Sequence, residues 1–172
     1  SYTSLVMSDG LHPVAAGYKI WAQKLKKEMA STDASDVSLT TLSYRTSDTT
    51  KKIAVTGFKS ENTDKTTFDV ELPLGTDANA TVQLFETTSN LNAAVTVNGG
   101  TELQTASYQD ENGKDIYSYI DDETSYVQDR YIPVTLSGGK ATVTFTVTAA
   151  DGKAKKKYTV KFVTKDSVED IT

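Results

Sequence analysis

The stretch that decides the fold is residues 141–163, which read ATVTFTVTAADGKAKKKYTVKFV. Side chains two positions apart lie on the same face of a β-strand, and Asp-Gly is a strong signal for a hairpin turn. The Asp151-Gly152 pair divides the stretch into two alternating halves, which predicts two paired strands with one buried face each. The apolar residues that would form this face are Val143, Phe145 and Val147 in the first half and Tyr158, Val160 and Phe162 in the second.

Short β-prone runs separated by turn residues continue outward from this hairpin as far back as residue 37. Further turn signals occur at Asn98-Gly99-Gly100 and at Gly138-Gly139. Many short strands with frequent turns predict a mainly β protein with an antiparallel β-sandwich. The expected strands are residues 37–44, 51–58, 67–72, 80–86, 93–98, 131–136, 141–149 and 155–163.

Four segments of this region carry a recognisable order of motifs: TFDVELPLGT at 67–76, AVTVNG at 94–99, VTAADG at 147–152 and YTVKF at 158–162. In this respect residues 50–164 are similar to the cadherin-like β-sandwich repeats of bacterial surface proteins. The resemblance implies an Ig/cadherin-like sandwich that serves as a spacer, an adhesive unit or a carbohydrate-binding accessory. The chain departs from the compact repeat by an insertion near 101–130, within an expected sandwich domain at 37–172.

The first 30 residues have a helical rather than a β period. Pro13 suits the first turn of a helix, where its missing N–H would be unpaired in any case. Apolar residues then recur near every fourth position, which predicts one amphipathic helix whose apolar face needs a partner surface. This face comprises Ala16, Ile20, Trp21, Leu25 and Met29. Residues 31–36 are small and acidic and predict a linker.

The only histidine, His12, follows Asp9 by three positions. A β-turn over residues 9–12 would bring the two side chains together, and an aspartate that orients a histidine base is half of a Ser-His-Asp apparatus. The alternative is that Asp9 forms an Asx-turn with nearby backbone N–H groups and that His12 is a surface residue.

The sequence Asp9-Gly10-Leu11-His12-Pro13, followed by Ala16-Gly17-Tyr18 and Trp21, resembles the C-terminal block of SGNH/GDSL-type hydrolases. The resemblance implies that residues 1–30 are the last loop and helix of an α/β hydrolase domain, with Asp9 as the orienting acid and His12 as the general base. It implies hydrolysis of a carboxylic ester, on an acylated carbohydrate or a lipid ester, by a secreted bacterial enzyme. The chain contains no Gly-Asp-Ser turn, so we expect it to be inactive alone and its nucleophile to come from a longer polypeptide that also carries the signal peptide.

The expected insertion is rich in tyrosine and carboxylate. Tyrosine rings can stack on sugars, which makes four of them candidates for ligand binding: Tyr108, Tyr117, Tyr119 and Tyr126. The alternative is that they pack over a sandwich edge, as we also consider for Tyr131. The same insertion contains a candidate for calcium binding in Asp110, Asn112 and Asp115, although its spacing is not that of an EF-hand and Asn112-Gly113 also fits a plain hairpin turn.

Composition narrows the function classes. The formal net charge is −5, with 18 Lys and Arg against 23 Asp and Glu, which argues against a nucleic-acid partner. The chain has no cysteine and one histidine, so we expect no transition-metal site and no cofactor, and no apolar run is long enough for a membrane span. The acidic, cysteine-free composition suits a secreted or cell-surface location. The only basic run, Lys153 with Lys155–Lys157, is expected to lie on a solvated hairpin edge. For these residues the alternative to the esterase is a non-catalytic module that binds polysaccharide or attaches to a cell surface.

Overall fold

The computed structural model describes residues 30–46, 52–106 and 130–165. These residues form nine strands, and no helix occurs among them. The strands are β1 (Leu39–Thr46), β2 (Ile53–Ala54), β3 (Thr67–Leu72), β4 (Thr81–Thr88), β5 (Ala94–Val97), β6 (Gln104–Thr105), β7 (Arg130–Thr135), β8 (Lys140–Thr148) and β9 (Lys155–Thr164). The predicted helix at 13–29 and residues 107–129 of the expected insertion lie outside the described residues.

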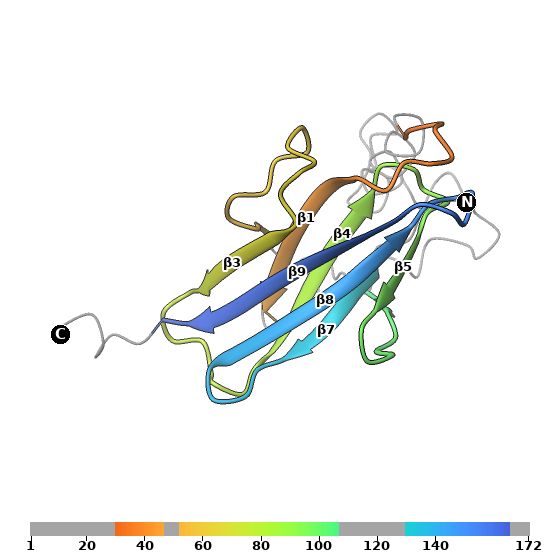
Figure 1. The fold of residues 1–172 in the computed structure, drawn as a ribbon. Coiled ribbons are helices and arrows are strands. Elements are labelled where there is room, and N and C mark those ends of the chain that lie inside the picture. Colours follow the sequence, from red (N-terminus) through yellow and green to blue (C-terminus); the bar gives the residue numbers. More distant parts are fainter. Residues whose placement is uncertain (1–29, 47–51, 107–129, 166–172) are drawn as a thin grey trace, which may run out of the picture. The chain divides into compact units, whose positions relative to one another are not determined.

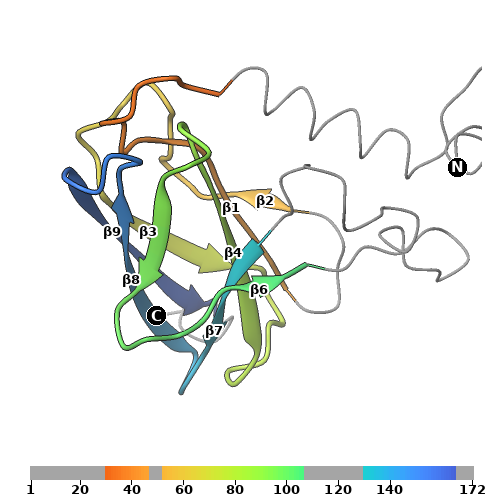
Figure 2. The same cartoon turned by 90° about the vertical axis from the view of Figure 1, so that its right-hand side faces the viewer.

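The strands form two sheets that pack face to face. One has the order β2-β1-β4-β7-β6 and the other the order β3-β9-β8-β5. Figure 1 looks onto the second sheet, with β1, β4 and β7 of the first sheet behind it, and Figure 2 shows the short strands β2 and β6 beside β1 and β7. The predicted mainly β fold is confirmed, and the two layers form a β-sandwich.

The hairpin of β8 and β9 is the longest ladder of the structure. It runs without interruption from Lys140↔Val163 to Thr148↔Lys155. Gly152 in its turn has a φ of 75°, a left-handed conformation that side chains other than Gly, Asn and Asp rarely adopt. The turn predicted from Asp151-Gly152 is therefore the one that forms.

One strand pair departs from the predicted antiparallel arrangement. β3 lies parallel to β9, from Thr67↔Thr159 to Leu72↔Thr164, whereas β1–β2, β1–β4, β4–β7, β5–β8 and β8–β9 are antiparallel pairs. Parallel neighbours cannot be joined by a tight turn and need a long connection. Here that connection is the rest of the sandwich, because β4 to β8 all lie between β3 and β9 in the sequence. Alternation of side chains fixes which face of a strand is buried but not its direction.

The core lies between the sheets and consists of the inward side chains of both. β3 shows the pattern most simply, with Phe68, Val70 and Leu72 each at most 1% exposed between exposed polar neighbours. The ring of Tyr44 from β1 meets that of Phe162 from β9 edge-on, with centroids 5.9 Å apart. This contact joins the two sheets directly. The other buried members of the core are Leu39, Leu42, Val55, Val82, Leu84, Ile132, Val134, Leu136, Val143, Phe145, Val147, Tyr158 and Val160.

The segment that precedes β1 is hydrogen-bonded to loops of the sandwich. The Ser31 amide donates to the Ser89 carbonyl at 2.8 Å, and the side-chain amide of Asn90, which is 5% exposed, donates to the Asp33 carbonyl at 2.8 Å. The Asp151 amide, from the β8–β9 turn, donates to the Ala34 carbonyl at 2.9 Å. Residues 31–36, expected as a linker, are thus fixed to the same compact unit as residues 37–104 and 130–165.

The two sheets are unequally covered along one side. β5 has four residues and pairs only with the second half of β8, from Phe145 to Thr148. β6 has two residues beside β7. The first half of β8 and the neighbouring part of β7 therefore extend past their edge strands, and this unequal cover creates the groove described below.

Candidate functional site

The residues that the sequence singles out for chemistry lie outside the described part of the chain. This holds for the predicted acid and base, Asp9 and His12, and for the candidates in the insertion. Their mutual arrangement stays a prediction. The insertion candidates are Tyr108, Tyr117, Tyr119 and Tyr126 for sugar stacking and Asp110, Asn112 and Asp115 for calcium.

Tyr131 is the one tyrosine considered beside the insertion candidates that the structure describes. It lies in β7, where its ring packs at a tilt against Phe85 of β4, with centroids 5.7 Å apart. Its hydroxyl donates a hydrogen bond to the side-chain carbonyl of Gln104 at 2.8 Å. The Lys52 ammonium lies 4.1 Å from the centroid of Phe85, so Phe85 is also engaged in a cation–π contact. Tyr131 packs over the sheet, as the alternative interpretation expects.

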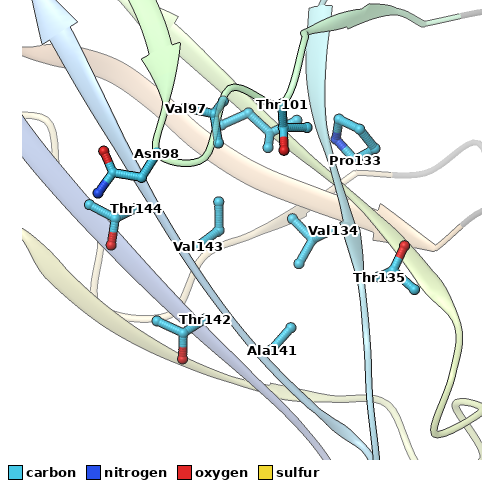
Figure 3. Close-up of a pocket in the computed structure, with 11 residues that line it drawn as sticks. Val97, Asn98, Thr101, Pro133, Val134, Thr135, Ala141, Thr142, Val143 and Thr144 are labelled. Carbon is cyan, nitrogen blue, oxygen red and sulfur yellow. The ribbon is translucent and has the colours of Figure 1, made fainter.

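The described sandwich contains a groove on the side where β5 and β6 are short. Its volume is about 300 Å³, at the lower end of the range for ligand sites. Three segments line it: the turn after β5, the outer part of β7 and the first half of β8 (Figure 3). The lining residues are Val97, Asn98, Thr101, Ile132, Pro133, Val134, Thr135, Ala141, Thr142, Val143 and Thr144.

The groove has an apolar floor and a neutral polar rim. The floor includes Val134 and Val143, inward residues of facing strands that are 6% and 8% exposed. Figure 3 shows Asn98 and Thr101 on the turn above them and Thr135 at the far side. The rim therefore offers hydroxyl and amide groups, which can donate and accept hydrogen bonds without carrying charge.

The local sequence explains the turn after β5 that lies over the groove floor. Gly99 and Gly100 follow Val97-Asn98 with φ values of 90° and 79°, so the chain reverses immediately after β5. The Asn98 amide still donates to the Thr144 carbonyl at 2.9 Å, which anchors the turn to β8. The turn predicted from Asn98-Gly99-Gly100 is confirmed.

The side chains that line the groove are uncharged. None of the residues that line the groove titrates near neutral pH, so the groove supplies no general acid or base of its own. The threonine hydroxyls have no adjacent base within the lining that could activate them as nucleophiles. Among the described residues, no group of three His, Cys, Asp or Glu side chains is placed to hold a metal ion.

Pro133 of β7 limits the addition of a protein strand at this wall of the groove. Pro133 lies in the groove wall and has no N–H to donate to a neighbouring strand.

Sequence reasoning missed the groove because its lining comes from three separate segments of ordinary threonine and valine content. The only local signal is the sharp Asn-Gly-Gly turn after a four-residue strand, which shortens the cover of β8. In residues 30–46, 52–106 and 130–165, no helix has the length and apolar character needed to cross a lipid bilayer. No known family and no curated protein matches the sequence of the chain.

Proposed function

We propose that the sandwich is a non-catalytic carbohydrate-binding module of a secreted or cell-surface bacterial protein. The observation that carries the proposal is the groove between β7 and β8, with its neutral hydroxyl and amide rim. Sugars present alternating apolar C–H faces and hydroxyl groups. The floor at Val134 and Val143 suits the first, and the rim at Asn98, Thr101 and Thr135 suits the second.

Retention on polysaccharide gels tests this function. The full chain is run through native gels that contain a panel of neutral and acidic polysaccharides, and its mobility is compared with that in a gel without polymer. Thr101→Val, which removes a rim hydroxyl, and Ala141→Leu, which fills the groove, should each reduce retention at least about threefold, since one lost hydrogen bond contributes about 1 kcal/mol. Thr40→Val is the matched control, because Thr40 is an exposed strand residue outside the groove.

Two outcomes would contradict the groove as the site. Retention that survives both groove variants but is lost in Tyr117→Ala/Tyr119→Ala would place sugar binding on the predicted tyrosines instead. If no polysaccharide retards the chain, the carbohydrate-binding proposal fails and the spacer or adhesive role remains.

We further propose that residues 1–30 belong to an SGNH-type ester hydrolase, to which the sandwich is an accessory. The support is the motif Asp9-Gly10-Leu11-His12-Pro13 and the helical pattern after it. In such an enzyme a serine from another part of the polypeptide attacks the ester carbonyl of an acylated glycan or lipid ester. His12 takes the serine proton, and Asp9 stabilises the resulting imidazolium. A module that holds a glycan would keep the enzyme near acylated polymer.

Ester turnover tests the hydrolase proposal. The 172-residue chain alone should not hydrolyse an activated ester above background, because a comparable triad loses roughly 10⁶-fold in kcat without its serine. In a longer polypeptide that includes a Gly-Asp-Ser turn, His12→Ala should reduce kcat by at least about 10³-fold, whereas His12→Ala should leave retention on polysaccharide gels unchanged. Turnover by the isolated chain, or full activity of the His12 variant, would refute this assignment.

A further inference from the structure

The outer face of the β3-β9-β8-β5 sheet carries rows of lysine and threonine. On β9, Lys155, Lys157 and Lys161 are exposed and alternate with the buried core residues. On β8 the outward residues are Lys140 and four threonines. We call eight of the outward side chains of these two strands the Lys–Thr face: Lys155, Lys157, Thr159 and Lys161 of β9 and Thr142, Thr144, Thr146 and Thr148 of β8. The exposed pair Lys140 and Val163 lies at the end of this face.

The usual reason for lysines on a strand applies to one end of this face. Lysine on an edge strand prevents unwanted pairing with other chains, and the sequence predicted such an edge for Lys155–Lys157. β9 lies between β3 and β8, but β3 pairs only with Thr159–Thr164, so Lys155–Lys157 have β8 as their only described strand neighbour and the edge prediction is confirmed. Lys161, in contrast, has a strand on each side, and charged residues are not favoured by the intrinsic preferences of such a position.

The register sets lysines beside hydroxyl groups. Lys155, Lys157 and Lys161 of β9 are the direct partners of Thr148, Thr146 and Thr142, respectively. The lysines span six residues along β9, or roughly 20 Å at about 3.3 Å per residue. The face thus offers a line of cations, each with a neutral hydrogen-bonding neighbour.

Negative charge is concentrated on one side of this line. The acidic residues on the outward face of this sheet are Asp69 and Glu71, both on β3. Glu71 pairs with Lys165 at 3.7 Å, and Asp69 is level with Lys161 in the parallel ladder. No described residue forms an ion pair with Lys155 or Lys157, so this end of the face keeps its positive charge in a chain with a net charge of −5.

We propose that the Lys–Thr face binds an anionic polysaccharide, with Lys155 and Lys157 contacting its acidic groups and the β8 threonines its hydroxyls. This inference rests on the proposed carbohydrate-binding function and names the class of ligand. The groove and the face are continuous, because Thr142 and Thr144 belong to both. A polymer that enters the groove with neutral sugars therefore reaches the lysines over β9.

The same surface favours a glycan over a nucleic acid. Single-stranded nucleic acids bind on aromatic side chains that stack with bases, usually with arginine nearby. The described outward residues of β3, β9, β8 and β5 include neither an aromatic residue nor an arginine. Threonine hydroxyls, in contrast, match the hydroxyl groups of sugars.

Binding measurements on matched polymers test the inference. The full chain is titrated with polygalacturonate, with its methyl ester, with alginate and with single-stranded DNA of similar length, at about 50 and about 200 mM salt. We expect the chain to bind polygalacturonate, alginate or both, and to bind them less tightly at the higher salt. We expect little binding to the methyl ester or to DNA. Lys155→Gln/Lys157→Gln should raise the apparent Kd on the order of tenfold at the lower salt, because two ionic contacts are lost.

The control variant is Lys59→Gln/Lys65→Gln, which removes the same charge from two exposed residues between β2 and β3. It should change the apparent Kd less than about twofold, and thermal unfolding should show that both variants are folded. Equal loss in the two variants, or DNA binding as strong as glycan binding, overturns the inference. Salt-independent binding of the methyl ester also overturns it but leaves carbohydrate binding intact, whereas failure of every polysaccharide, in this titration and on the gels, removes both.

Discussion

The two long sides of the sandwich are built differently. On the side of β1, β3 and β9, the edge strand β2 is also only two residues long, but long strands of both sheets face each other beside it and aromatic rings from both sheets meet, as Tyr44 and Phe162 do. On the side of β5 and β6, the edge strands have four and two residues, and the facing parts of β7 and β8 enclose a groove. We refer to these as the closed side and the open side.

The comparison shows how one fold can separate stability from binding. Residues on the closed side are almost completely excluded from water, with Val160 at 0% and Phe162 at 2% exposure. The corresponding floor of the open side, at Val134 and Val143, retains 6% and 8%. Shortening two edge strands exposes a strip of the core to a ligand without removing any strand that holds the sheets together.

The largest effect should come from the ring that joins the sheets on the closed side. Phe162→Ala removes a side chain that is 2% exposed and its edge-on contact with Tyr44. We expect the free energy of unfolding to fall by about 3–5 kcal/mol, the usual cost of replacing a buried Phe by Ala. Urea denaturation followed by tyrosine fluorescence measures this. A loss below about 1 kcal/mol would show that the closed side does not carry the stability assigned to it.

A smaller loss of stability should appear at high pH, and it should come from Tyr158 of β9 on the closed side. Burial, reinforced by the negative charge of Asp36, raises the pKa of Tyr158 to about 12 from its ordinary value of 10. Between pH 10 and 12 the unfolded chain loses this proton while the folded chain keeps it, so the stabilisation present below pH 10 is lost as the pH rises. The loss should be on the order of 2 kcal/mol.

Tyr158→Phe provides the control for this pH dependence. The variant also loses the hydrogen bond that the Tyr158 hydroxyl donates to the Val37 carbonyl at 2.9 Å, which should cost about 1 kcal/mol at neutral pH. Its stability should then fall less steeply from pH 10 to 12 than that of the wild type. A residual slope is expected from Tyr44, since burial raises the pKa of that residue too. An unchanged slope would mean that Tyr158 is not the titrating group.

The smallest effect compares the same substitution on the two sides. Val160→Ala, within the closed side, should destabilise the protein by about 2 kcal/mol through lost burial and a closed cavity. Val143→Ala, in the groove floor, should cost about 1 kcal/mol, because solvent can reach the space that it leaves. Thermal unfolding of the two variants under identical conditions gives the difference, and equal losses would break the distinction between the sides.

Much of the strand pattern could be predicted because each signal is local. The expected strand at 67–72 has the bounds of β3, and the alternation around Asp151-Gly152 predicts both β8 and β9. The expected strand at 51–58 is reduced to β2, because the chain turns at Val55, whose carbonyl accepts a hydrogen bond from the Phe58 amide at 3.1 Å. Gly57, at the third position of this turn with a φ of 83°, is the residue that such a turn favours, so the sequence contained a signal that the expected strand overlooked.

The parallel pairing of β3 with β9 and the groove could not be predicted, since both depend on residues far apart in the chain. Val160 lies opposite Phe68 only once β3 and β9 have paired in their final register. Similarly, Thr101, Pro133 and Thr142 have no property in the sequence that brings them to one site. The Asp9–His12 pair shows the converse, a chemically specific motif whose geometry lies outside the described residues.

The central place of β9 has a consequence for the order of events during synthesis. Lys155–Thr164 is the last described strand to leave the ribosome, yet β3 and β8 meet only through it. The earlier strands of that sheet keep their apolar faces exposed until nearly all of the described residues have been translated. Contacts that close such long loops make folding slow, and an exposed half-built layer is prone to aggregate. Nascent chains halted before Lys155 should therefore be captured by chaperones, whereas release of ten further residues lets the layer close in one step.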